Sequence, residues 1–120
     1  MPITREFRQT VLARAQTDRQ FRQAMLTEAV NELLAGDLTA GKAMLRDYIN
    51  ATITFERLAK ALKKPSKSLQ RMLGLGGNPT AESIFGIIKV LQGTERVQLQ
   101  VKAAKKTASK TDRSRWLRRF

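Results

Sequence analysis

Apolar residues recur at intervals of three and four positions along most of this chain, and this spacing constrains the fold more than any other feature. Such a period places the apolar side chains on one face of an α-helix. It predicts a first helix from about Thr4 to Gln16 and a second that follows a capping box at Thr17 and ends at Gly36. Because the connection is so short, we expect residues 1–36 to form a helical hairpin.

The same period continues through residues 37–93, where four further helices are predicted. They are a helix from Leu38 to about Ile53, a short helix capped by Thr54, a helix from Pro65-Ser66 to Leu73, and a helix from Thr80 to Gln92 that Gly93 ends. The last of these has an apolar face made of Ile84, Phe85, Ile87, Ile88 and Leu91. Gly74–Pro79 is a loop by composition. The fold class is therefore all-α, with one exception near the C-terminal end.

That exception is residues 94–102, where the period changes from helical to two. Val97, Leu99 and Val101 alternate with polar residues, which is typical of a strand. A single strand needs a partner edge, and the chain offers no second strand. We expect these three residues to pair with another copy or a different protein, although the N-terminal hairpin could hold a homodimer instead. Residues 103–120 are basic with little apolar content and are expected to form a flexible tail.

The charge is concentrated in two segments. The chain has 120 residues and a net charge of +13, of which residues 54–73 carry +5 and residues 102–120 carry +7. An excess of this size implies an anionic partner. The two segments need separate explanations because they lie far apart in the sequence.

Several classes of function are made improbable by composition. The chain has no cysteine and no histidine, so thiolate and imidazole catalysis and the usual zinc and haem ligands are excluded. Its carboxylates form no catalytic motif, and we expect neither an enzyme nor a cofactor. The longest apolar stretch, residues 84–88, is far too short for a membrane span. A cytoplasmic protein without membrane contact is expected.

Residues 55–73 resemble a helix-turn-helix. A small residue is needed where the two helices cross, and Ala59 provides it, while Leu69 ten positions later is the inward anchor of the second helix. The exposed face would then present Arg and Gln, which read guanine and adenine, beside Ser and Lys, which can take phosphates. The residues assigned to DNA are Thr54, Ser66, Lys67, Ser68, Gln70, Arg71 and Asn78. The alternative is an ordinary pair of amphipathic helices whose charges face water.

Residues 41–92 as a whole resemble the five-helix DNA-binding domain of the Cro and repressor (Xre) family. More specifically, residues 45–52, 65–73 and 77–80 resemble the HigA-like addiction-module antidote proteins. That resemblance implies a dimeric cytoplasmic antitoxin of a toxin-antitoxin system. Such a protein neutralises a RelE-type toxin and represses its own operon at a palindromic operator in double-stranded DNA. The turn differs from the family pattern, because Lys63 and Lys64 stand where a glycine and an aliphatic residue are usual.

A second hypothesis gives the basic tail the main role. On this reading the protein binds nucleic acid without sequence preference, through Lys and Arg of residues 103–120, and the helices are only a scaffold. Trp116 among four arginines could stack on bases or insert into a membrane surface.

Overall fold

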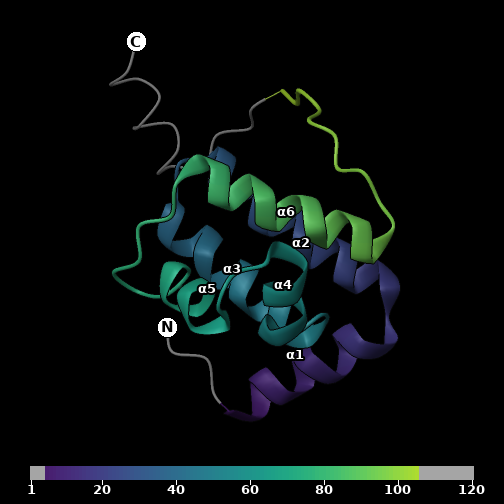
Figure 1. Cartoon of the computed structure of the whole chain (residues 1–120). Helices are drawn as coiled ribbons and strands as arrows, with labels where there is room; N and C mark the ends of the chain where they lie inside the picture. Colours follow the sequence, from purple (N-terminus) through teal and green to yellow (C-terminus); the bar gives the residue numbers. More distant parts are fainter. Residues whose placement is uncertain (1–4, 106–120) are drawn as a thin grey trace.

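All regular structure in residues 5–105, the part of the chain that the computed structural model describes, is α-helical (Figure 1). The prediction of an all-α fold is therefore confirmed at this level. The helices are α1 (Arg5–Thr17), α2 (Arg19–Leu34), α3 (Leu38–Ala51), α4 (Phe55–Leu62), α5 (Ser66–Met72) and α6 (Ala81–Glu95). No helix in the described residues is long and apolar enough to cross a membrane.

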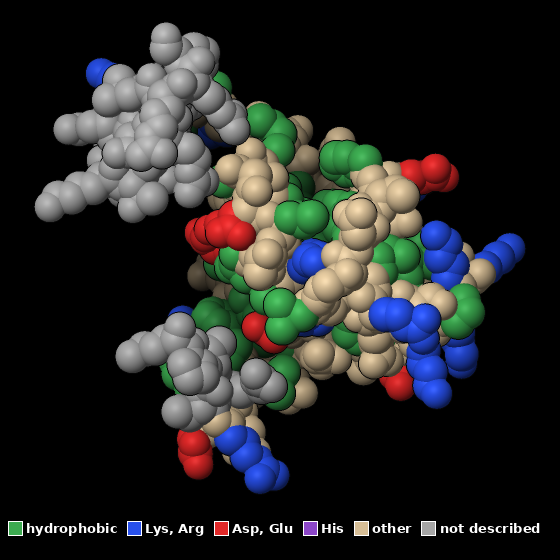
Figure 2. Space-filling view, turned by 90° about the vertical axis from the view of Figure 1, so that its left-hand side faces the viewer, with side chains coloured by type: hydrophobic (Ala, Val, Ile, Leu, Met, Phe, Trp, Pro, Cys, Tyr) green, Lys and Arg blue, Asp and Glu red, His purple; other side chains and the backbone are tan. Residues whose placement is uncertain are grey.

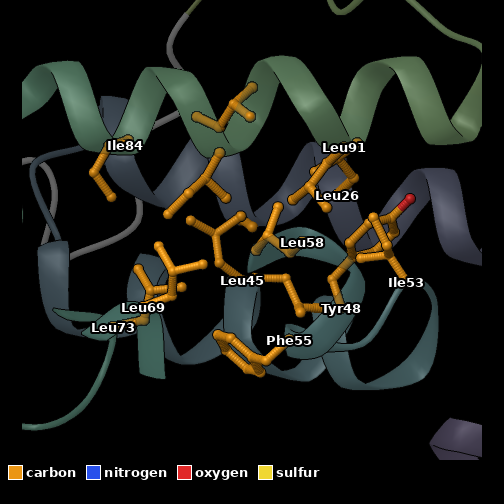
Figure 3. Packing of buried hydrophobic residues seen from close by; sticks show 14 of the residues in the cluster. Leu26, Leu45, Tyr48, Ile53, Phe55, Leu58, Leu69, Leu73, Ile84 and Leu91 are labelled. Carbon is orange, nitrogen blue, oxygen red and sulfur yellow. The ribbon is translucent and has the colours of Figure 1, made fainter. Parts of the chain in front are cut away.

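The five helices from α2 through α6 share one hydrophobic core. The α2–α3 pair has the most extensive contact, α4 packs on both α5 and α6, and α1 lies against α2 and α3 (Figure 1). Figure 3 shows Leu26 of α2 beside Leu91 of α6, and Leu45 of α3 between Leu58 and Leu69. The second helix of the N-terminal hairpin thus shares its core with the rest of the chain. The inward face of this helix is buried because the helical period places its apolar side chains on one side.

The start of α2 and the end of α6 differ from the prediction, and the end of α2 agrees with it. Asp18 caps α2, because its side chain accepts a hydrogen bond from the Phe21 N–H at 3.1 Å, whereas Thr17 ends α1. That hydrogen bond lowers the pKa of Asp18 below its usual value. Gly93 does not end α6, which continues to Glu95 before Arg96 takes the left-handed conformation at a φ of 58°. Gly36 ends the hairpin's second helix as expected, with a φ of 87°.

Phe85 is a further correction, because the sequence placed it on the inward face of α6. Its side chain is 67% exposed, while Ile84, Ile87 and Ile88 are buried. A helix buries one stripe of residues, and positions 84, 87, 88 and 91 already complete that stripe. Phe85 is apolar but lies outside it.

A buried polar network connects α2, α3 and the end of α6. The Tyr48 hydroxyl donates to Glu95 Oε1, and Arg22 Nε donates to the same carboxylate at 3.2 and 3.3 Å. Glu95 is only 6% exposed. Burial and the Glu95 hydrogen bond raise the pKa of Tyr48, so its hydroxyl keeps the proton that it donates. Arg22 also donates to the Ala15 carbonyl at 2.9 Å, which extends the network to α1.

Residues 97–105 contain no regular structure in this single chain. The Leu99 N–H donates to Gln92 Oε1 at 2.7 Å, and the Leu99 side chain packs against the core. Val97 is half-buried, and Val101 is 82% exposed. The predicted strand requires a partner from another chain, so it stays a prediction. Residues 103–105 of the predicted tail are exposed, and the rest of it, residues 106–120, lies outside the described residues.

Candidate nucleic-acid interface

A three-residue turn, residues 63–65, joins α4 to α5, and the two helices are in contact. Leu58, Ala59 and Leu69 are all buried there, with Leu69 only 1% exposed. Figure 3 shows Leu69 and Leu73 together below α6, pointing into the core. Leu69 is therefore the inward residue of α5, as the sequence predicted, and Ala59 is buried on α4.

The turn after α4 is made without glycine. Lys63 takes the left-handed conformation at a φ of 55°, and the Lys64 N–H donates to the Ala59 carbonyl at 3.0 Å. This is the hydrogen bond of a Schellman helix end, in which the left-handed position usually holds glycine. Lys63 therefore fills a position that glycine would occupy with less strain, and its charge remains exposed beside α5.

Two basic side chains of α3 hold the C-terminal end of α5. Arg46 Nη1 donates to the Leu73 carbonyl at 2.8 Å. Lys42, one turn earlier, donates from Nζ to the carbonyls of Gly74 and Gly77 at 3.1 and 2.7 Å. The Leu73 carbonyl is at the end of α5, and those of Gly74 and Gly77 belong to the loop that follows, so these bonds hold both the helix end and the loop against α3. Sequence reasoning missed both residues, because a lysine in a charge-balanced segment gives no sign that it is only 7% exposed.

Most of the residues assigned to DNA lie on one exposed surface. Lys67, Ser68, Gln70 and Arg71 are exposed on α5, opposite the buried Leu69. Ser66 is half-buried, and its Oγ accepts a hydrogen bond from Gln70 Nε2 at 3.0 Å. Asn78 is also exposed, and it belongs to the loop after α5.

Thr54 and Gln70 both line an open cleft with a volume of about 430 Å³. The other lining residues come from α3, from the start of α4 and from the loop after α5: Arg46, Asn50, Phe55, Glu56 and Gly74. The cleft is open to solvent, and its lining combines polar and apolar groups. The sequence assigned two of its residues and missed the others, whose contribution depends on how α3 and α4 pack.

Thr54 does not cap α4 with its side chain, contrary to the prediction. It occupies the N-cap position, yet its side chain makes no capping hydrogen bond, and its backbone has φ 72° and ψ 155°. That region is one that glycine adopts readily and a β-branched residue adopts at a cost of about 1–3 kcal/mol. The Thr54 N–H donates to the Ile49 carbonyl at 2.8 Å, which helps to hold the backbone in this conformation.

Thr54→Gly should raise the free energy of unfolding by about 1 kcal/mol, because the relief of strain exceeds the extra entropy of an unfolded glycine. Urea denaturation of the two proteins measures this difference. Thr54→Ala is the control, since alanine keeps the strain and loses only the hydroxyl and methyl groups. Equal stability of the Gly and Ala variants would contradict the strained conformation.

Positive charge covers this side of the molecule. Figure 2 shows Lys and Arg side chains along its right-hand side, which corresponds to the front of Figure 1, where α4 and α5 lie. Six basic residues of this segment are exposed, and in the described part of the chain none of them is in an ion pair: Arg57, Lys60, Lys63, Lys64, Lys67 and Arg71. Glu56 is the one acidic residue of residues 54–73. The surface is therefore suited to a polyanion.

Comparison of the chain with protein-family models, curated proteins and solved structures gave no match in any of the three.

Proposed function

We propose that this protein is a sequence-specific DNA-binding repressor in which α4 and α5 act as a helix-turn-helix. The observation that carries the proposal is the exposed face of α5, where Lys67, Gln70 and Arg71 stand opposite the buried side chain of Leu69. An α-helix fits the major groove of B-form DNA. The unpaired cations around α5 supply the attraction to phosphates that such docking requires.

The side chains of this surface divide into two roles in the proposal. Arg71 and Gln70 have the bidentate geometry that reads guanine and adenine. Lys67 and Ser68 contact phosphates and set the register of α5 on the duplex. Thr54 and Asn78 flank α5 and contribute further contacts to the sugar-phosphate backbone of the DNA. The bonds from Lys42 and Arg46 support this arrangement, since a reading helix must be held firmly to discriminate between bases.

Arg71→Ala should weaken binding to the preferred operator by about 1–3 kcal/mol and relax the preference at one base pair, because the wrong and right bases then offer equal contacts. Fluorescence anisotropy with the operator and with single-base variants measures both effects. Lys89→Ala, an exposed cation on α6, is the matched control and should leave base preference unchanged. A uniform loss across all sequences would make Arg71 a phosphate contact instead.

The repressor acts as a homodimer in this proposal, with α5 of each copy in one half-site of a palindromic operator. The exposed Val101 belongs to the segment that would pair between copies. Val101→Arg should therefore shift the sedimentation equilibrium toward monomer and weaken operator binding, without changing the fold of the monomer. An unchanged dimer would exclude this segment and leave the N-terminal hairpin as the interface.

We also propose that the protein is the antitoxin of a RelE-type toxin. This role is supported by the sequence resemblance to HigA-like proteins alone. The test is to express the tagged chain from its native operon and to purify it together with any bound protein. A small co-purifying protein that cleaves messenger RNA when released would support the role, and recovery of the chain by itself would count against it.

The competing function is binding of nucleic acid without sequence preference, which the net charge of +7 in residues 102–120 favours. Deletion of residues 103–120 distinguishes the two functions. If α5 reads the operator, the shortened protein keeps its preference for that sequence, and the slope of log affinity against log salt falls by about 0.9 per lost phosphate contact. If the tail dominates, binding to all sequences is lost.

A further inference from the structure

An apolar groove between α2 and α3 has no role in the proposed DNA contact. It has a volume of about 220 Å³ and is lined by Phe21, Ala24, Met25, Glu28, Met44 and Asp47. Four of these side chains are apolar, and both charged ones are acids. A groove of this kind suits a segment that combines large apolar side chains with positive charge.

The charged groups around the groove preserve this character. Arg14 lies with its guanidinium carbon 4.6 Å from the centre of the Phe21 ring, and it is paired with Asp18 at 3.5 Å. That pair is neutral as a unit, so Glu28 and Asp47 determine the sign of the groove. The Arg14 contact also shows that the Phe21 ring accepts a guanidinium group on its face.

The chain itself contains a segment of complementary chemistry. Residues 113–120 read Arg-Ser-Arg-Trp-Leu-Arg-Arg-Phe, with four cations, three large apolar residues and no acid. From Lys105 the eleven residues to Trp116 can extend over roughly 36–40 Å. The described part of the molecule measures 43 × 30 × 29 Å along its principal axes, so this reach is comparable with the longest dimension of the molecule. A tethered segment also has an effective concentration in the millimolar range.

We propose that in the free protein the side chains of Trp116 and Leu117 dock in the α2–α3 groove of their own chain, with neighbouring arginines beside Glu28 and Asp47. The apolar side chains cover Met25 and Met44, and the arginines neutralise the two carboxylates. Docking of this kind holds part of the tail's positive charge on α2 and α3, apart from the α4–α5 surface. The inference does not depend on what the α4–α5 surface binds.

The chain has one tryptophan, Trp116, which makes its fluorescence a direct reporter of the docked segment. The full chain without DNA should show emission shifted to shorter wavelength, and slower quenching by acrylamide, relative to the same chain unfolded in urea. Quenching should slow at least twofold. Both properties should be independent of protein concentration, because the docking is within one chain.

Ala24→Arg places bulk and positive charge in the groove at an exposed helical position and should restore the emission of the unfolded chain. The double variant Glu28→Gln with Asp47→Asn should weaken docking without adding bulk. Glu32→Gln, one turn further along α2 and outside the groove lining, is the matched control and should behave as the unaltered chain. Circular dichroism checks that each variant remains helical.

Three results would overturn the proposal. Emission identical to that of the unfolded chain would show that Trp116 is not docked. A shifted emission that survives both groove variants would place Trp116 elsewhere on the protein. A shift that appears only as concentration rises would show that the groove takes the segment of a second copy or that the chains associate through it. None of these results bears on operator binding.

Discussion

Arg22→Met is expected to lower the free energy of unfolding by about 3 kcal/mol, because it leaves the buried Glu95 carboxylate without its cation. Glu95 is 6% exposed, and after the change its carboxylate keeps the hydrogen bond from the Tyr48 hydroxyl but loses its ion pair with Arg22. The same substitution removes the Arg22 bond to the Ala15 carbonyl, so α1 should loosen as well. Urea denaturation at neutral pH measures the loss of stability.

Two further proteins isolate the charge effect. Adding Glu95→Gln to Arg22→Met removes the uncompensated charge while the amide oxygen still accepts from Tyr48, so the double variant should be more stable than Arg22→Met alone. Arg14→Met breaks the exposed pair with Asp18 and should lower the free energy of unfolding much less than Arg22→Met, because solvent screens an exposed pair. Equal losses for Arg22→Met and Arg14→Met would mean that the buried network does not hold α2 to α6.

Gly77→Ala is expected to cost about 2–3 kcal/mol, because the new methyl group has no room. A Cβ at this position would lie 2.3 Å from the Met72 carbonyl oxygen and 2.4 Å from that of Arg71. Both atoms belong to the backbone of α5, so the loop must move away from the helix. Movement of the loop also lengthens the Lys42 bond to the Gly77 carbonyl. Operator affinity should fall together with stability, since α5 then loses part of its support.

The control for Gly77→Ala is the same substitution at Gly93. A Cβ there meets nothing within 4 Å, and Gly93 lies inside α6. Alanine is the better helix former, so Gly93→Ala should raise the free energy of unfolding by about 0.5–1 kcal/mol. Thermal denaturation of both variants gives the comparison. Similar stability for the two would contradict the close packing of the 74–77 loop against α5.

The helices could be predicted because their signals are local. The apolar period located all six within a few residues, and the left-handed glycine at Gly36 and the small residue at Ala59 each have a direct steric cause. The exposed face of α5 followed from the same period, since the anchor at Leu69 fixes which side chains turn outward.

What could not be predicted depends on contacts between distant residues or on the choice between similar local signals. Tyr48 and Glu95 are 47 positions apart, and nothing in either helix marks them as partners. Thr17 and Asp18 are both good caps, and the chain uses the second. Gly93 could end a helix, but α6 continues because Leu91 and Glu95 are both buried by its last turns. The apolar groove between α2 and α3 also could not be predicted, because it forms only when the two helices pack together.

The central claim is that α5 reads a DNA sequence, and selection from a random pool of DNA duplexes tests it most directly. The full chain at near-physiological salt should enrich one palindromic sequence, with half-sites about one helical turn apart, and a footprint should cover both half-sites. The enriched sequence should lose its advantage when Gln70 and Arg71 are both replaced by alanine. Recovery of no preferred sequence, or the same sequence with the doubly substituted protein, would contradict the claim.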